Sequence, residues 1–298
     1  MITVFGSANI DLICSVERLP GPGETILGSS FRKAPGGKGA NQALAAQRAG
    51  GEVRLAGRIG ADHHAAEATA LLREAGIDLS FLNVSASPTG TAHITVSADG
   101  ENTIVVVPGA NGEVTVADAD QALDSMGKGD HLVVQLEIPE EAVQTALLMA
   151  RVNGVTSILN LSPITASIGK LGKLADIIVT NETEFDLYTG TELSGSRRTD
   201  EMLKMSSRTG QTIIVTLGAK GVVAARGGEL YHAGGLKVVP LDTVGAGDTL
   251  CGYLAAGLDQ GLEFGVALKQ AAVAGSLACL KSGAQPSIPF IGDVAKSL

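Results

Sequence analysis

The sequence predicts an α/β fold in which a largely parallel sheet is flanked by helices and carries a small β-sheet lid. Three observations lead to this prediction. Short β-branched runs alternate with helix-forming stretches along much of the 298-residue chain, as is typical of parallel strands joined by helices. Two extended segments, residues 12–34 and 88–108, lack helices of their own, so we expect them to form the lid together. Hydrophobic residues make up 45% of the chain, enough to bury a large core.

The chain opens with a predicted strand, Ile2–Phe5, which runs into a polar turn. Asn9 and Asp11 follow at or just past the carboxyl end of this strand. Ligands of open α/β sheets bind at that edge. The two side chains are therefore candidates for ligand binding.

A glycine-rich turn at residues 35–42 precedes a helix-forming stretch, Ala43–Ala49. Lys38 and Asn41 are three residues apart and so share one face of the first helical turn. The glycines allow a ligand to approach closely, and an asparagine amide can both donate to and accept from a hydroxyl. No Ser or Thr follows the lysine, so the segment is not a P-loop. A capped helix start with a solvated lysine is the alternative interpretation.

The next predicted elements are strand Val53–Ala56, helix Asp62–Ala75, strand Phe81–Val84, and a hairpin formed by residues 91–97 and 102–107. His63 and His64 lie at the start of the helix. No third ligand is spaced to join them, so we expect both imidazoles to be solvated rather than to bind a metal ion.

Strands and helices then alternate regularly through the second half of the chain. The predicted elements are His131–Leu136, Glu140–Val152, Val155–Leu159, Ala175–Thr180, Glu182–Thr189, Arg197–Arg208 and Thr212–Leu217. Glu137 follows one of these strands and Asn160 another, which places both at the carboxyl edge of the predicted sheet.

Two strand ends in this region carry polar or glycine-rich sequences. Asn181 is a predicted helix cap with Glu184 three residues later, and the alternative is that Glu184 holds Mg²⁺ through water. Residues 216–221 form a glycine loop after the next strand. Such a loop is suited to lying along a nucleotide.

The segment Asp242–Asp248, with the sequence DTVGAGD, is the strongest chemical signal in the chain. It lies between a predicted strand, Leu236–Leu241, and a helix that runs to about Leu258. The N-H groups of Gly245, Ala246 and Gly247 would form an anion site at the helix start. A carboxylate beside such a site suggests phosphoryl transfer with Asp248 as general base. An ordinary glycine turn before a helix is the alternative.

The last predicted helix is Phe264–Leu280, followed by a loop at residues 281–287 that is rich in backbone carbonyls. Together with the Asp242 carboxylate, this loop could hold a monovalent cation. A plain surface loop is the default interpretation of its composition.

Composition excludes several classes of function. The net charge is −9, and no block of Lys or Arg suits a nucleic-acid backbone. Three widely spaced cysteines indicate free thiols in a reducing compartment. We find no signal peptide and no apolar tract long enough to span a bilayer, so we expect a cytoplasmic protein without a membrane partner.

Together these segments resemble the ribokinase family, the phosphofructokinase-B type of sugar kinases. The resemblance rests on residues 6–11, 36–42, 135–137, 181–184, 242–248 and 283–287, in that order along the chain. It implies one Rossmann-like α/β/α domain over residues 1–298, with a β lid of about 12–34 and 88–108 that is often used for homodimerisation. It also implies ATP-dependent phosphorylation of a sugar hydroxyl, with Mg²⁺ and K⁺ as cofactors.

The resemblance also implies a role for individual residues. Asp248 would deprotonate the attacking hydroxyl beside the amides of Gly245, Ala246 and Gly247. The residues implied to bind the sugar are Asn9, Asp11, Gly37, Lys38, Asn41, Glu137 and Asp248. Those implied to line the ATP site are Asn181, Thr216, Gly218, Lys220, Gly221 and Gly247. Glu184 would organise Mg²⁺ through water. The monovalent-cation site would use Asp242, Val244, Ala278, Lys281, Gly283 and Ser287.

The sugar-facing set favours D-ribose, phosphorylated at O5, as the substrate that the resemblance implies. A sister kinase for deoxyribose, another sugar or a nucleoside is the first alternative. A sugar- or nucleotide-binding regulator without catalysis is an alternative of another class. Ribokinases commonly place a polar or ring side chain against the adenine, where this chain has Ala271-Ala272-Val273.

Overall fold

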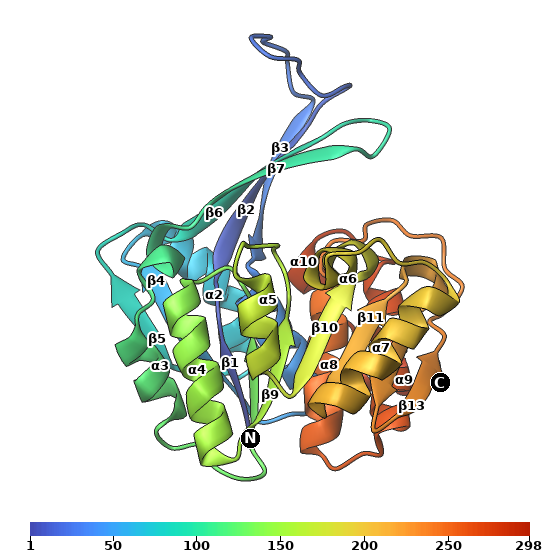
Figure 1. Cartoon of the computed structure of the whole chain (residues 1–298). Helices are drawn as coiled ribbons and strands as arrows, with labels where there is room; N and C mark the ends of the chain where they lie inside the picture. The colour runs from blue at the N-terminus through green and yellow to red at the C-terminus, as the bar shows by residue number, and fades with distance from the viewer.

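The computed structural model describes residues 1–298 and contains two sheets (Figure 1). The larger has nine strands in the order β13-β12-β11-β10-β9-β8-β1-β4-β5. Its strands are β1 Ile2–Phe5, β4 Val53–Gly60, β5 Asp78–Ser85, β8 His131–Val134, β9 Thr156–Asn160, β10 Ile177–Asn181, β11 Thr212–Thr216, β12 Val222–Arg226 and β13 Glu229–Ala233. The seven strands from β11 through β10, β9, β8, β1 and β4 to β5 pair in parallel, whereas β12 and β13 are antiparallel.

Helices cover both faces of this sheet, and each face has its own core. The main helices are α1 Lys38–Arg48, α2 His63–Glu74, α3 Val116–Leu123, α4 Glu140–Asn153, α6 Glu182–Thr189, α7 Ser196–Thr209, α8 Ala246–Asp259 and α9 Phe264–Ala278. Short helices are α5 Ile168–Leu171, α10 Ala284–Ser287 and α11 Ile291–Ala295. Helices α1, α2, α8 and α9 pack in a cluster of 39 buried residues, and α3, α4, α6 and α7 pack in one of 30. The predicted three-layer α/β/α fold is confirmed.

The second sheet has four strands in the order β3-β2-β6-β7 and projects from one edge of the layered body (Figure 1). Its strands are β2 Asn9–Ser15, β3 Ser30–Gly36, β6 Gly90–Val96 and β7 Asn102–Val107. The predicted small sheet is therefore confirmed. Asn9 and Asp11 lie at the start of β2, where this sheet leaves the end of β1.

One predicted strand was wrong. Residues Leu236–Leu241 form no strand and cross from β13 to α8 as an extended segment. Pro240 has no N-H to donate to a ladder, and the amides of Leu236 and Leu241 bond instead to Ser276 Oγ (3.1 Å) and Cys279 O (2.8 Å) of the α9 region. The segment is therefore held by hydrogen bonds to the α9 region rather than by strand pairing, and its β-branched Val239 is 89% exposed.

Sequence reasoning also missed the β12–β13 hairpin. Its two strands flank Gly227 and Gly228, both with positive φ. A two-glycine turn between apolar runs is a hairpin signal that the sequence does carry. No helix in the structure combines the length and apolarity required to cross a membrane.

Candidate active site

Four neighbouring strands of the large sheet deliver polar groups to one place. Glu137 lies just beyond β8, and Asn160, Asn181 and Thr216 end β9, β10 and β11. The N-terminus of α8 faces the same edge, and a polar cavity of about 270 Å³ lies between these elements. It is lined by Lys38, Asn160, Ser162, Val179, Thr180, Asn181, Glu184, Thr216, Thr243, Gly245, Gly247 and Asp248.

Asp248 lies in the first turn of α8 and is 7% exposed. Its carboxylate accepts hydrogen bonds from Asn41 Nδ2 (2.9 Å) and Gln42 Nε2 (2.8 Å) of α1. Gln42 is itself held, because its Oε1 accepts from Gln135 Nε2 at 2.7 Å. Two buried amides therefore fix the carboxylate, and a third fixes one of them. Asn41 Oδ1 is buried without a partner, which leaves an acceptor free for a ligand hydroxyl.

The α8 N-terminus is shaped for an anion. Gly245 is its N-cap with φ 79°, a left-handed conformation that favours glycine, and no side chain caps the helix. Ala246 N donates to Thr243 O at 3.3 Å, whereas the N-H groups of Gly245, Gly247 and Asp248 meet no protein acceptor. These free amides lie at the positive end of a 14-residue helix, so the turn can stabilise negative charge.

The predicted sugar-binding residues converge where the small sheet meets the body. Glu137 Oε2 accepts from Lys38 N (3.0 Å) and from Ser7 Oγ (2.5 Å). Gly37 has φ 89°, and a Cβ on it would come within 2.7 Å of Asn9 N. The turn can therefore pass close to β2 only with glycine at this position.

Sequence reasoning missed Asn111, a buried residue that orients Asn9. Asn111 Nδ2 donates to Asn9 Oδ1 at 2.7 Å, and Asn111 Oδ1 accepts from Ala8 N at 3.0 Å. Asn111 thus takes up the Asn9 side-chain oxygen, so the amide nitrogen of Asn9 is the group that remains available as a donor. The Pro108-Gly109 turn ahead of Asn111 was a signal of a specific loop, but nothing in the sequence connects it to Asn9.

Charge is concentrated around the same point. Burial, together with the nearby carboxylates of Glu137 and Asp248, raises the pKa of Asp11 to about 7, and Arg32 partly opposes this shift. For Lys38, burial acts to lower the pKa, but Asp248, Glu137 and Glu184 outweigh it, so the net pKa is raised. The site therefore holds one firmly charged ammonium among several acidic groups, one of which titrates near neutrality.

We expect Asp11→Asn to stabilise the ligand-free protein at pH 8. The native pKa of Asp11 is about 7, whereas the ordinary pKa of an aspartate is 3.8. Between these values the native state binds more protons than the unfolded state, so stability falls as pH rises. The substitution should raise the free energy of unfolding at pH 8 by about 1–3 kcal/mol and by clearly less at pH 5. Urea denaturation at both pH values measures this. The exposed Asp200→Asn serves as control, and an equal gain at pH 5 and pH 8 would contradict the titration.

An apolar cleft of about 380 Å³ adjoins the α8 N-terminus. Four of the six predicted nucleotide residues, Thr216, Gly218, Gly221 and Gly247, line it. Asn181 lines the polar cavity instead, and Lys220 is exposed and lines neither. The remaining lining residues come from the glycine loop, the non-strand segment 236–243, the first turns of α8, and one face of α9 with its C-cap Cys279; only Ala246 and Ala272 among them had been given a role from the sequence. They are Ala219, Leu236, Lys237, Val238, Pro240, Thr243, Ala246, Leu250, Ala272, Gly275, Ser276 and Cys279.

The expectation that Ala271-Ala272-Val273 lies against the adenine is only partly met by the structure. Only Ala272 borders the cleft, since Ala271 and Val273 are fully buried. The helical period places Gly275, Ser276 and Cys279 on the same face as Ala272. The α9 wall of the cleft is therefore made of small side chains.

Asn181 and Glu184 form the predicted cap. Asn181 Oδ1 accepts from Glu184 N (2.8 Å), and Glu184 Oε2 accepts from Asn181 N (2.9 Å). Glu184 also lines the polar cavity together with Asp248. Capping uses only one carboxylate oxygen, so the other can face a hydrated Mg²⁺, which prefers oxygen ligands and retains water.

The loops at the other end of the cleft meet at Asp242. Its Oδ1 accepts from Val244 N (3.0 Å), and its Oδ2 accepts from Gly283 N (2.9 Å). Ala278 is the last residue of α9, and Lys281 follows it. Ser287 ends α10, and its hydroxyl donates to Ala284 O. The structure thus brings Asp242, Val244 and Gly283 together directly behind the α8 N-terminus.

Comparison with known proteins gives a consistent result. The model of a family described as pfkB family carbohydrate kinase matches residues 1–291. The chain is 37% identical to a ribokinase of Haemophilus influenzae, covering 97% of this chain and 95% of that protein. It is 31% identical to a deoxyribokinase of Salmonella typhi, covering 97% and 96%. The structure of an Arabidopsis thaliana ribokinase complexed with ribose and ATP matches with a TM-score of 0.87 at 30% identity, covering 99% of this chain and 97% of that one.

Proposed function

This chain belongs to the pfkB family of carbohydrate kinases and is an ATP-dependent sugar kinase, and on that premise we propose that it transfers phosphate from ATP to O5 of D-ribose. The observation that carries the proposal is the position of Asp248. Its buried carboxylate lies between the polar residues around Glu137 and the free amides of the α8 N-terminus.

In the proposed reaction the O5 hydroxyl gives its proton to Asp248 as its oxygen bonds to the γ-phosphorus. The bond from that phosphorus to the bridging oxygen breaks, and ADP leaves. Negative charge that develops on the transferring group is met by the N-H groups of Gly245 and Gly247. The Lys38 ammonium adds positive charge from the first turn of α1. Positioning and charge neutralisation are the main requirements of phosphoryl transfer, and this site offers both.

Sugar hydroxyls have matched partners in this proposal. Asn9 offers a donor, Asn41 an unpaired acceptor, and Asp11 and Glu137 carboxylate oxygens. Such a set recognises a polyol with several hydroxyls close together. We propose that the small sheet, from residues 12–34 and 88–108, covers this sugar and acts as a lid within a single domain.

The nucleotide is proposed to lie in the apolar cleft with its phosphates directed at the α8 N-terminus. Glu184 and the cavity around it would hold hydrated Mg²⁺, which neutralises phosphate charge when bound. The small side chains of the α9 wall leave room for a base without offering a specific polar partner.

The test is ADP release from Mg-ATP with ribose, deoxyribose, fructose, 2-keto-3-deoxygluconate, adenosine and pseudouridine as acceptors. A kcat/KM for ribose well above all others supports the proposal. A preference for deoxyribose, the sugar in the name of a relative at 31% identity, would be compatible with Asp248 as general base but would contradict ribose as the substrate. Absence of turnover with any acceptor, together with sugar and nucleotide binding, would favour a non-catalytic regulator.

We propose that K⁺ binds behind the anion site, at Asp242 and the carbonyl groups of residues 244, 278, 281, 283 and 287. Replacing Na⁺ by K⁺ in the assay should raise kcat, because a fitting cation orders the loop that carries Gly245. Steady-state rates in the two salts at equal ionic strength measure this. The response should shrink in Asp242→Asn, and indifference of the unmodified protein to the ion would remove the site.

The small sheet also exposes large apolar side chains, including Phe31 (64%) and Val105 (64%). Exposed apolar clusters on this scale mark interaction surfaces. We propose that the lid joins two copies of the chain and that the protein functions in the cytoplasm. Val105→Asp should convert the dimer to a monomer in light scattering, whereas Val239→Asp, exposed but outside the sheet, should not. A monomeric unmodified chain would contradict this interface.

A further inference from the structure

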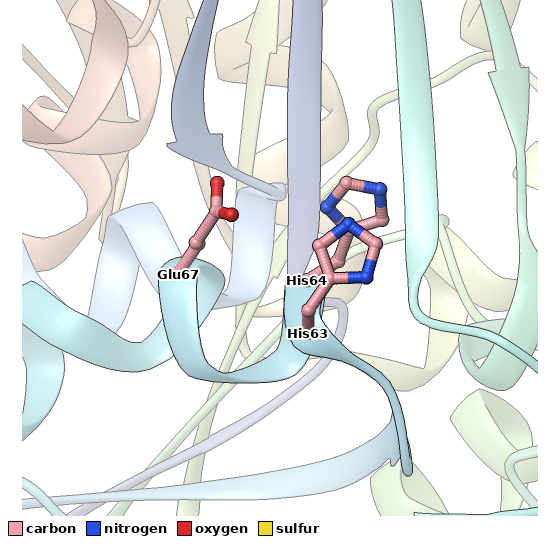
Figure 2. A group of neighbouring side chains, drawn as sticks. All are labelled: His63, His64 and Glu67. Carbon is pink, nitrogen blue, oxygen red and sulfur yellow. The ribbon is translucent and has the colours of Figure 1, made fainter.

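Three side chains with metal-ligating atoms meet at the start of α2 (Figure 2). They are His63, His64 and Glu67, and their ligand atoms lie within 4.8 Å of one another. The expectation that no third ligand joins the two histidines was wrong. Glu67 is four residues after His63 and three after His64, so one helix face presents all three. We propose that this cluster binds a divalent transition-metal ion such as Zn²⁺.

The second observation concerns His64. Its Nδ1 is buried and has no hydrogen-bond partner. The two imidazoles lie with their centroids 3.9 Å apart and tilted by 44°, and His63 is exposed whereas His64 is partly buried. A ring nitrogen that neither water nor a protein group reaches is an unsatisfied buried polar atom. Coordination to a metal ion would satisfy it.

In the structure, Glu67 already forms an ion pair with Lys33. Lys33 Nζ lies 2.7 Å from Glu67 Oε1, with side-chain exposures of 35% and 42%. Ion pairs this exposed contribute little to stability, so a divalent ion can displace the ammonium at small cost. Asp62, the N-cap of α2, adds a second negative charge.

The ligand atoms define the metal class. Two imidazole nitrogens and one carboxylate oxygen suit Zn²⁺, Ni²⁺ or Cu²⁺, whereas Mg²⁺ and Ca²⁺ prefer oxygen ligands throughout. Three protein ligands leave at least one position for water. The Mg²⁺ that accompanies ATP should therefore not compete for this site.

Metal binding here acts on the small sheet. Lys33 lies on β3, which leads through Gly36 into the loop that carries Lys38, and its pair with Glu67 ties β3 to α2. A bound ion would coordinate Glu67 and release Lys33. The ion pair that connects β3 of the small sheet to α2 of the layered body would then be lost. The metal site is thus separate from the active site, but it contacts β3, the strand that leads into the loop carrying Lys38.

The test is calorimetric titration of ZnCl₂ into the full chain after removal of metal with a chelator. We expect one equivalent of Zn²⁺ to bind, with affinity reduced at least about tenfold in His64→Gln and in Glu67→Gln. The exposed histidines of β6 and β13 give matched controls, so His93→Gln and His232→Gln should bind as the unmodified chain does. Lys33→Met should bind Zn²⁺ up to about fivefold more tightly, because it removes the competing ammonium.

Several outcomes would overturn the proposal. One is Zn²⁺ binding that persists in His64→Gln but disappears in Cys14→Ser, which would assign the ion to a thiol. Unchanged affinity in Glu67→Gln is another, and absence of binding at micromolar Zn²⁺ is a third. Kinase activity with Mg-ATP in the three α2 and β3 variants, His64→Gln, Glu67→Gln and Lys33→Met, checks that they are folded and should remain unchanged.

Discussion

Asp248→Asn is expected to lower kcat by about 10²- to 10⁴-fold, the range over which a general base contributes, while leaving sugar affinity nearly intact. The substitution preserves shape and removes the proton acceptor. It also places an amide where Asn41 and Gln42 now donate. Asn41 can turn its unpaired Oδ1 toward the new amide, so the local packing can be retained.

Single-turnover rates with Mg-ATP and calorimetric sugar binding separate the two effects. The control is Asp259→Asn, which makes the same substitution at the last residue of the same helix, where the carboxylate bonds to the N-terminal amine and His131. That variant should lose stability rather than turnover. Near-normal kcat in Asp248→Asn would remove the residue from the chemistry.

The parts of this site that were predictable are those that local rules specify. DTVGAGD combines a glycine turn, a helix start and an acid, and the structure places each of these as expected, with Gly245 as N-cap and Asp248 in the first turn. Parallel strand order then follows from alternation, because each strand–helix–strand unit repeats the same connection. The carboxyl ends that carry Glu137, Asn160 and Asn181 come together for that reason.

The parts that were not predictable depend on contacts between distant segments. Gln42 meets Asp248 across 206 residues, and Asn111 meets Asn9 across 102. Nothing local marks either amide as part of the site. The prediction for Leu236–Leu241 was wrong for the opposite reason. Its β-branched composition predicts a strand, but Pro240 and the hydrogen bonds to Ser276 and Cys279 keep the segment out of the sheet. Glu67 was not predicted as a ligand, although its spacing of three and four residues from the two histidines places it on their helix face.

Gln42→Leu should lower kcat by about 10- to 100-fold without weakening sugar binding. Gln42 is fully buried, and its amide donates both to Asp248 and, at 3.2 Å, to Asn160 Oδ1. We expect it to act as a positioning residue, because it contacts the proposed base, Asp248, rather than the reactants. A carboxylate held by Asn41 alone can rotate, and displacement of a reacting group by about 1 Å can cost about 10²-fold in rate.

A double-mutant cycle distinguishes positioning from general damage. If Gln42 acts through Asp248, Gln42→Leu should have no further effect on kcat in the Asp248→Asn background, so the two losses will not add. Gln211→Leu is the matched control. Gln211 is also buried and also donates two hydrogen bonds, to Gly172 O and Ala175 O, but it lies away from the site. That variant should unfold more easily at unchanged kcat. Additive losses in the cycle would mean that Gln42 contributes only to the fold. Asn41 would then be the only one of the two α1 amides that acts on Asp248.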